Sequence, residues 1–215
     1  MIFDRTPTLR QAELSFDLEN RAIDFNLADG AELYLIRQFY SQPESDQIFT
    51  TLLSGLHWQE EDIFIFRKWV KVPRLMCWYG DPDAYYEYSG INHQPKPWTS
   101  ELRDIREKVE QQCRCAFNSV LANLYRNGKD SMGCHADDEK ELGINPVIAS
   151  LSLGDGRLFK MHHKKSKQTL AINLAHGDLL VMGGTCQQHW LHSVPKTKII
   201  KTPRINLTFR EILTG

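Results

Sequence analysis

Two histidines and one aspartate have the residue types and the spacing of a metal site. His135 and Asp137 are separated by one residue, and side chains two apart in an extended segment point to the same side, so both can reach one cation. His192, in the segment HWLHSVP, is the candidate for a third ligand. Two histidines and one carboxylate on one face of a metal, with open positions opposite, are typical of non-haem iron(II) oxygen chemistry. We therefore predict that these residues bind Fe(II), and that the open positions accept 2-oxoglutarate and O2.

The spacing by itself does not single out these ligands. An H-x-D pair followed by a distant histidine also occurs by chance among surface residues, and other histidines are rival ligands. His189 precedes His192 by three residues and would face the other side of a strand, so we interpret it as a structural or supporting residue. The other rivals are His162, His163 and His176.

The C-terminal segment RINLTFR alternates between polar and apolar residues, as a strand with two different faces does. The polar face carries Arg204, Asn206, Thr208 and Arg210, and the apolar face carries Ile205, Leu207 and Phe209. The apolar face requires a core, whereas the polar face meets solvent or lines a cavity. Two guanidinium groups in a cavity suit a dicarboxylate, because arginine binds carboxylates bidentately.

A mainly β framework must position these side chains. From about residue 117, short apolar segments such as VLANLY, VIASLSL and TLAINL are separated by turn signals such as NGKD and AHGD. Upstream we expect a strand over 33–37, a helix with a capping box after Ser41 that ends near Gly55, a strand or hairpin over 63–70, a loop-rich region over 71–98 and a helix over 100–115. The predicted fold is α+β and mainly β, with two helices outside an antiparallel double sheet.

Composition favours an ordinary globular protein in a reducing compartment. The chain has 215 residues, of which 41% are hydrophobic and 25% charged. Its five cysteines form no C-x-x-C pair, which argues against a disulfide framework. We find no long apolar run and no secretory h-region near the start, so no membrane association is expected. We expect a monomer in the cytoplasm, associated with the nucleoid in a bacterium, or in the nucleus of a eukaryote.

The net charge of −1 hides an uneven distribution of charge. Residues 1–62 contain twelve acidic and four basic residues, whereas residues 156–204 contain nine basic residues and one acidic residue. The basic part can form a face that meets phosphates, and a solvated surface of mixed charge is the alternative explanation.

The candidate motifs occur in the order and spacing of a known family. The segments NLYRNGKDSMGCHADDE, LAHGDLLVM, HWLHSVPK and PRINLTFR resemble the AlkB family of iron(II)- and 2-oxoglutarate-dependent dioxygenases. VPRLMCWYGD and YYEYSG resemble its branch that repairs alkylated DNA. The resemblance covers roughly residues 33–213, and it implies a double-stranded β-helix, or jelly roll, in agreement with the strand pattern.

The resemblance also implies roles for the candidate residues. His135, Asp137 and His192 would be the iron ligands, and Arg204 would bind the distal carboxylate of 2-oxoglutarate with help from Tyr125. The other co-substrate contacts would come from Asn123, Asn206, Thr208 and Arg210, the last of these near the carboxylate at the iron.

The implied reaction removes an alkyl group from a ring nitrogen by oxidising its carbon. 2-Oxoglutarate and O2 are consumed, succinate and CO2 are formed, and a methyl group leaves as formaldehyde. The expected substrates are N-alkylated bases in DNA, such as 1-methyladenine and 3-methylcytosine, which would make the protein a direct-reversal DNA repair enzyme. Oxidation of RNA bases or of a protein side chain, and a non-catalytic nucleic-acid-binding module, remain alternatives.

A base in a duplex must be flipped out to reach such a site. Tyr86 and Tyr88, which flank Glu87, are candidates to stack on the flipped base, or else are core residues. Asp138 and Glu139 would accept a hydrogen bond from an amino group of adenine or cytosine, or else would orient neighbouring groups of the metal site.

The segment IFIFRKW is the candidate wedge that fills the gap left by the flipped base. Ile65 and Phe66 would insert, unless the phenylalanines of this strand are core residues. Arg67 stands where the related human-type enzyme has a small residue. Lys68, Arg74 and the basic segment 157–167 would bind phosphates.

The expected organisation has three parts. Residues 1–32 form an N-terminal extension, residues 33–98 recognise the nucleotide and residues 99–215 form the catalytic β-helix, with 33–215 as one domain. One departure from the family concerns Cys134, beside the first ligand, where bacterial relatives often carry a large aromatic residue. The pocket wall there is expected to differ, or the thiol to be open to oxidation.

Overall fold

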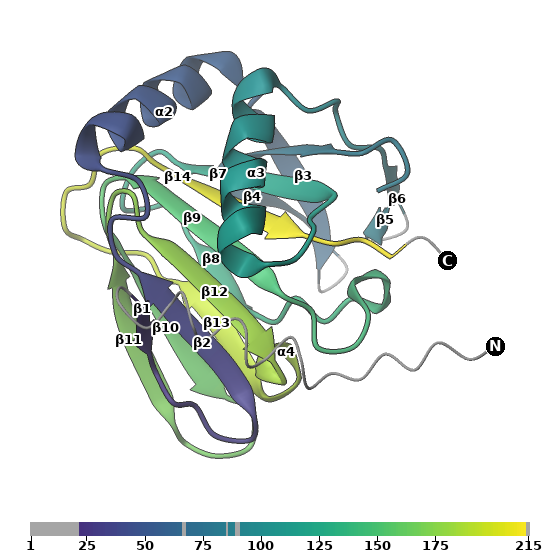
Figure 1. Ribbon diagram of the computed structural model, residues 1–215, viewed down its shortest axis with the longest axis vertical. Helices are drawn as coiled ribbons and strands as arrows, with labels where there is room; N and C mark the ends of the chain where they lie inside the picture. Colours follow the sequence, from purple (N-terminus) through teal and green to yellow (C-terminus); the bar gives the residue numbers. More distant parts are fainter. Residues whose placement is uncertain (1–21, 66–67, 85, 89–90, 214–215) are drawn as a thin grey trace.

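Two antiparallel sheets and two long helices form the framework of the protein (Figure 1). The computed structural model describes residues 22–65, 68–84, 86–88 and 91–213, without the side chains of 63–65, 86–88 and 91–93. In this part of the chain, no helix is long and apolar enough to span a membrane.

The large sheet contains eight strands among the described residues. From edge to edge they are β1 (Ala22–Asp24), β2 (Ala31–Ile36), β12 (Leu179–Gly184), β9 (Ile148–Gly154), β14 (Arg204–Arg210), β7 (Ser119–Tyr125), β4 (Lys68–Gly80) and β3 (Gln59–Ile65). β14 thus lies in the middle of the sheet, hydrogen-bonded to β7 on one side and to β9 on the other.

The small sheet contains the strands that carry the two histidine ligands. Its order is β11 (Thr169–Leu174), β10 (Arg157–His163), β13 (Trp190–Val194) and β8 (Met132–His135). A separate hairpin pairs β5 (Tyr86–Tyr88) with β6 (Ile91–His93). The two larger sheets form the expected double-stranded β-helix.

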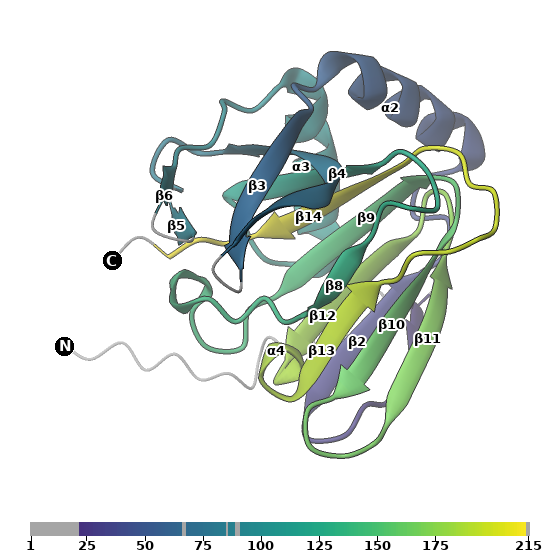
Figure 2. The same cartoon turned by 180° about the vertical axis from the view of Figure 1, so that it is seen from behind.

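The two helices lie on the outer face of the large sheet, away from the small sheet (Figures 1 and 2). α2 (Gln42–Gly55) begins with the expected capping box, in which the carboxylate of Glu44 accepts the backbone N–H of Ser41 at 2.8 Å. α3 (Ser100–Cys113) begins at Thr99, whose hydroxyl oxygen accepts the backbone N–H of Leu102 at 3.2 Å. Both helices match the predicted ranges closely.

Two apolar cores hold these layers together. The outer core joins the helices to the large sheet and includes Leu102, Ile105, Leu151, Leu207 and Phe209. The inner core lies between the sheets and includes Ile148, Leu180, Met182, Phe159 and Met161. The apolar face of β14 therefore points to the outer core, as the alternation predicted, and its polar face points to the small sheet.

The prediction that 71–98 is loop-rich was wrong for its first part, because β4 continues to Gly80. The register between β3 and β4 shifts between Glu60 and Asp62, and Pro73 lies in the stretch of β4 opposite this shift. A proline has no N–H to donate, so it is tolerated where the ladder is already interrupted. Sequence alone shows the proline but not the irregular register that accommodates it.

The first part of the expected N-terminal extension lies outside the described residues, and its last part belongs to the large sheet. β1 pairs with β2, and β2 pairs with β12, so residues 22–32 extend the catalytic sheet. β3 and β4 extend the same sheet at its other edge through β7. The expected recognition region thus shares one continuous sheet with the catalytic region.

Candidate metal and co-substrate site

The predicted metal ligands converge between the two sheets. His135 on β8 lies directly opposite His192 on β13 in the antiparallel ladder, and Asp137 follows β8. One ligand atom from each residue lies within 4.8 Å of the others. Nε2 of His135 is 4.0 Å from Oδ1 of Asp137, and Nε2 of His192 is 3.8 Å from Oδ2. The three donors face one point, as a facial two-histidine, one-carboxylate site requires.

Burial and charge prepare these donors to bind a cation. Burial lowers the pKa of His192 to about 4, so its ring is neutral and its nitrogen lone pair is available. Burial alone would raise the pKa of Asp137, but the charges of Arg210, His192 and His135 outweigh it, and the pKa is lowered. Oδ2 of Asp137 is buried without a hydrogen-bond partner among the described residues. A divalent cation would satisfy this oxygen, so the donor set fits iron(II).

Hydrogen bonds to neighbouring groups fix the orientation of the ligands. Nδ1 of His135 lies 2.9 Å from the carbonyl oxygen of Gly133. Because a carbonyl only accepts, Nδ1 carries the proton, and Nε2 is left free for the metal. The backbone N–H of Asp137 donates to Oε1 of Gln187 at 3.0 Å, and its Oδ1 accepts from Arg210 at 2.6 Å.

The polar face of β14 lines a cavity beside the metal ligands rather than meeting solvent. Across the β7–β14 ladder, Arg204 is opposite Tyr125 and Asn206 is opposite Asn123. The cavity is lined by polar residues of the central strands, by all three metal ligands and by apolar side chains such as Phe159 and Met182. Its lining includes Asn123, Tyr125, His135, Asp137, Ser150, Arg204, Asn206, Thr208 and Arg210.

Arg204 shows what this cavity would hold. Its guanidinium is fully buried and donates to Ser152 Oγ at 2.9 Å, while Nε and Nη1 have no hydrogen-bond partner among the described residues. Burial lowers the pKa of this guanidinium. A buried cation with unused donors is costly unless an anion binds it, and such donors form charge-assisted hydrogen bonds with carboxylate oxygens. The cavity therefore suits an acid such as 2-oxoglutarate, with one end at Arg204 and the other at the metal.

Asn206 and Thr208 are already hydrogen-bonded to each other and to β9. Thr208 Oγ1 donates to Asn206 Oδ1 at 3.0 Å, and Asn206 Nδ2 donates to Ser150 Oγ at 2.8 Å. Oδ1 of Asn123 accepts from Nε of Arg74 at 2.6 Å. These side chains line the predicted cavity, and their direct contact with 2-oxoglutarate stays a prediction.

A second, larger cavity lies on the other side of the metal ligands. Its volume is about 460 Å³, and His135, Asp137, Arg210, Leu121 and Met132 line both cavities. Its wall is largely apolar, and β4 contributes more of it than any other element. The β4 residues that line it are Val70, Lys71, Val72, Pro73, Arg74, Met76 and Trp78. The metal ligands thus lie between a small cavity that contains two arginines and a larger, largely apolar cavity.

The two predicted acidic substrate contacts lie in different surroundings. Glu139 lines the larger cavity, and burial, the main cause, raises the pKa of its carboxyl. Its Oε2 is buried without a hydrogen-bond partner among the described residues. Asp138 is exposed, and its Oδ2 lies 3.1 Å from Nζ of Lys164. Glu139 is therefore the one placed to contact a molecule in the cavity.

Several predicted substrate contacts fall where the structure gives no side chains. Phe66 and Arg67 lie outside the described residues. Tyr86, Glu87 and Tyr88 form β5, but their side chains also lie outside the described residues. Lys68 is exposed at the start of β4.

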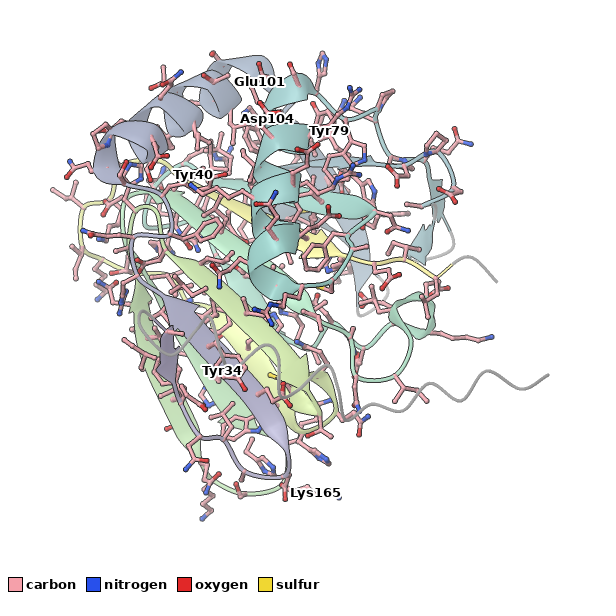
Figure 3. The ribbon with its side chains drawn as sticks, in the orientation of Figure 1. Tyr34, Tyr40, Tyr79, Glu101, Asp104 and Lys165 are labelled. Carbon is pink, nitrogen blue, oxygen red and sulfur yellow. The ribbon has the colours of Figure 1, made fainter. Side chains whose placement is uncertain are left out.

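Two arginines of the predicted phosphate-binding set are buried. Arg74 donates through Nη1 to the carbonyl of Ser131 at 3.4 Å, in addition to its bond with Asn123, and lines the larger cavity. Arg157 at the start of β10 is also buried. A phosphate on the protein surface would not reach the buried Arg157, whereas phosphate binding by Arg74, which lines the larger cavity, stays a prediction. Lys165 and Lys167 of the same segment are exposed, and Lys165 lies at the tip of the turn between β10 and β11 (Figure 3).

The rival histidines do not join the metal site. His163 and His189 form a second group with Asp29. In that group, Nδ1 of His163 accepts the backbone N–H of Ser166 at 2.7 Å, so its Nε2 carries the proton that is donated to Asp29 at 2.7 Å. Neither nitrogen of His163 is left for a cation. His176 accepts the backbone N–H of Gly154 at 2.7 Å, which is a structural role.

Sequence reasoning missed three residues that support the site. Ser150 and Ser152 on β9 hydrogen-bond Asn206 and Arg204, and Gln187 holds Asp137. The two serines could have been predicted, because IASLSLG alternates serine with apolar residues, as a strand with an inner polar face does. No sequence pattern predicts the role of Gln187, since its contact depends on how the short helix α4 (Cys186–His189) packs.

Fold and site together define the class of protein. A double-stranded β-helix that brings two histidines and one carboxylate beside a buried arginine, two of whose donors have no partner among the described residues, is the framework of a non-haem iron(II) oxygenase that uses a dicarboxylate co-substrate.

Comparisons with known proteins identify the family. A sequence profile of the 2OG-Fe(II) oxygenase superfamily matches residues 32–210, and the chain belongs to this family of iron(II)- and 2-oxoglutarate-dependent dioxygenases. Its relatives place it among the AlkB-type members. The DNA oxidative demethylase ALKBH2 of Homo sapiens is 39% identical over 185 residues, which cover 81% of this chain and 71% of that protein. The alpha-ketoglutarate-dependent dioxygenase alkB homolog 3 of Homo sapiens is 40% identical over 189 residues, covering 81% of this chain and 64% of that protein.

Two further comparisons qualify these likenesses. The chain spans 66% of the length of ALKBH2 from Bos taurus, with 38% identity. A solved structure of OsALKBH1 aligns with a TM-score of 0.59 over 88% of this chain and 100% of that chain, at 20% identity. At that identity the likeness shows the fold alone, and it agrees with the observed β-helix.

Proposed function

We propose that this protein oxidatively demethylates N-alkylated bases of nucleic acid, and of DNA in particular, with lesions of the 1-methyladenine and 3-methylcytosine type as substrates. The observation that carries the proposal is the position of the metal ligands between two cavities. His135 and Asp137 line both the small cavity that contains Arg204 and the larger, largely apolar cavity of about 460 Å³. A reaction in which an acid co-substrate and the alkyl group of a substrate react at one metal needs a cavity for each reactant beside that metal.

When bound, iron supplies the oxidation of the alkyl carbon at the expense of 2-oxoglutarate and O2. The protein positions the reactants. The free Nε and Nη1 donors of Arg204 receive the distal carboxylate of the co-substrate. Arg210 holds Asp137 through the 2.6 Å bond to Oδ1, which leaves Oδ2 for the metal. Burial keeps His192 neutral, so its ring nitrogen is free to bind the metal.

The larger cavity suits a flipped base. Val72, Met76 and Trp78 offer apolar surface to the faces of a planar ring. The unpaired Oε2 of Glu139 is an acceptor for the exocyclic amino group that adenine and cytosine share. An alkylated base placed there would present its alkyl carbon to the metal beside His135.

The remaining contacts are proposals that rest on the resemblance. Tyr86 and Tyr88, which flank Glu87 in the sequence, stack on the base. Phe66 and Arg67 contact the duplex beside the flipped base. Lys68 and the exposed lysines of the β10–β11 turn bind phosphates. Asp138 is not assigned to the base, because it pairs with Lys164.

The names of the relatives support DNA as the substrate. The ALKBH2 proteins of Bos taurus, Mus musculus and Homo sapiens are each named DNA oxidative demethylase. RNA is the second candidate, since single-stranded bases of either nucleic acid fit the same cavity. A monomer in the cytoplasm or nucleus stays a prediction.

The test measures demethylation of matched oligonucleotides that carry one 1-methyladenine, as single-stranded DNA, duplex DNA and RNA of identical sequence. Iron(II) and 2-oxoglutarate are added singly and together, and base, formaldehyde and succinate are quantified. We expect equal amounts of repaired base and formaldehyde on DNA only with both additions. The Asp137→Ala variant is the control and should give no product at micromolar iron, with an unchanged circular dichroism spectrum. Turnover by this variant, or faster repair of RNA than of DNA, would contradict the proposal.

A further inference from the structure

Arg157 is a buried cation that the proposed reaction does not use. It is the first residue of β10, its exposed fraction is 3%, and it does not line the co-substrate cavity. Its guanidinium donates to three backbone carbonyls, those of Asn127 at 3.2 Å, Asp130 at 2.7 Å and Pro195 at 2.9 Å. Among the described residues, no carboxylate lies within ion-pair distance of it. A buried charge with no carboxylate in direct contact is costly, and the charges of Asp130 and Asp155 act on Arg157 only from farther away.

The three carbonyls belong to the segments that flank the two histidine strands. Asn127 and Asp130 lie in the turn just before β8, which carries His135. Pro195 follows β13, which carries His192. One planar guanidinium thus connects the beginning of one ligand strand with the end of the other.

Arg157 also contacts the aromatic ring that faces the co-substrate arginine. Its Cζ lies 5.4 Å from the centre of the Tyr125 ring, and Cζ of Arg204 lies 5.1 Å from the same centre. Tyr125 itself is buried and sits opposite Arg204 in the ladder. Two buried guanidinium groups therefore share one ring at the end of the cavity away from the metal, and both favour an anion there.

We propose that Arg157 is a positioning residue for the distal carboxylate of the co-substrate. It acts through Tyr125, whose ring it fixes beside Arg204, and through the positive potential that a second cation adds to this end of the cavity. The proposal rests on the proposed function, in which Arg204 binds that carboxylate. A purely structural clamp for the two turns is the competing explanation, and it predicts no preference for the distal carboxylate.

The test compares two 2-oxo acids that differ only at the far end. 2-Oxoglutarate has the distal carboxylate, and 2-oxobutyrate lacks it. Dissociation constants are measured by calorimetry with manganese(II) in place of iron, so that no turnover occurs. Selectivity is the ratio of the constant for 2-oxobutyrate to the constant for 2-oxoglutarate.

We expect Arg157→Gln to lower this selectivity roughly tenfold, as expected for losing a buried cation near a carboxylate, and Arg157→Lys to lower it less, since it keeps the charge but not the planar fork. In turnover, the KM for 2-oxoglutarate should rise while kcat at saturation changes by less than about twofold. The matched control is Arg126→Gln. Arg126 donates to the Asp130 carboxylate at 2.8 Å in the same turn but does not contact the Tyr125 ring. The selectivity of the Arg126→Gln variant should therefore equal that of the wild type.

Equal weakening of both acids in the Arg157 variants would make Arg157 a structural clamp and overturn the proposal. Arg204→Gln separates this failure from that of the proposed function. If Arg204→Gln also leaves the selectivity unchanged, the distal carboxylate does not bind at Arg204. The co-substrate position given under the proposed function and the role proposed for Arg157 then fail together. If Arg157→Gln does not fold, Arg157→Lys carries the same test.

Discussion

The side-chain amide of Gln187 holds the backbone of Asp137, with its Oε1 accepting the N–H at 3.0 Å. Gln187 lies in α4, which leads directly into the strand of His192, and it is buried. Its backbone carbonyl also accepts Nζ of Lys164 at 2.9 Å. One residue on the approach to the second histidine therefore fixes the position of the carboxylate ligand.

Gln187→Leu removes this bond and leaves the Asp137 N–H buried without an acceptor. We expect iron(II) affinity to fall roughly tenfold, because partners behind a metal ligand typically contribute that much. Titration of the metal-free protein with iron(II) under anaerobic conditions measures the effect. Gln188→Leu is the matched control, since the amide of Gln188 is exposed and donates to Asn145 instead. An equal affinity in both variants would show that the bond to Asp137 does not orient the ligand.

Much of this architecture follows from local patterns in the sequence. The alternation of RINLTFR predicted which side of β14 is apolar. Packing of the helices on the large sheet enforces this register, because a shift by one residue would turn Arg204 toward the apolar core that contains Leu151 and Leu153. The H-x-D spacing predicted two ligands, because side chains two residues apart in one extended segment point to the same side whatever the rest of the fold. Gln187 and Arg157 could not be predicted, because their contacts join segments that only the completed fold brings together.

The two arginines of β14 should affect 2-oxoglutarate in different ways. Arg204→Ala removes the free donors of a buried cation, so we expect the KM for 2-oxoglutarate to rise by about tenfold or more. Arg210→Ala also removes the 2.6 Å bond to Asp137, so kcat should fall as well, because the metal carboxylate loses its support. Steady-state kinetics with varied 2-oxoglutarate and iron(II) separate the two. Activity within twofold of the wild type at limiting 2-oxoglutarate would contradict the cavity assignment.

Gly177 is required by the packing of the turn before β12 against the start of α2. Its φ is +81°, and an added Cβ would lie 2.5 Å from the carbonyl oxygen of Tyr40 and 2.7 Å from Oγ of Ser45. We expect Gly177→Ala to lower the free energy of unfolding by roughly 1–3 kcal/mol or more, the cost of strained backbone. Gly55→Ala, with nothing within 4 Å of its added Cβ, should be neutral or slightly stabilising. Urea denaturation of both variants measures this, and equal stabilities would contradict the steric argument.

Phe66, in the segment between β3 and β4, should matter more when the substrate is a duplex than when it is a single strand. Next to it in β4, Trp69 and Val70 are 61% and 41% exposed, and Val70 and Lys71 line the larger cavity. An inserted apolar side chain can occupy the gap that a flipped base leaves, which offsets part of the few kcal/mol that unstacking costs. A single strand has little stacking to break. Phe66→Ala should therefore lower the repair rate of duplex DNA several-fold more than that of single-stranded DNA.

The measurement is the ratio of duplex to single-strand repair rates for the wild type and Phe66→Ala at one fixed salt concentration, since phosphate contacts depend steeply on ionic strength. Lys68→Ala is the comparison. As an exposed cation beside the same segment, Lys68 should contribute to binding of either substrate, so its loss should slow both and weaken the salt dependence. If Phe66→Ala slows both substrates equally, Phe66 supports the cavity wall, and the discrimination between duplex and single strand must arise elsewhere on the protein.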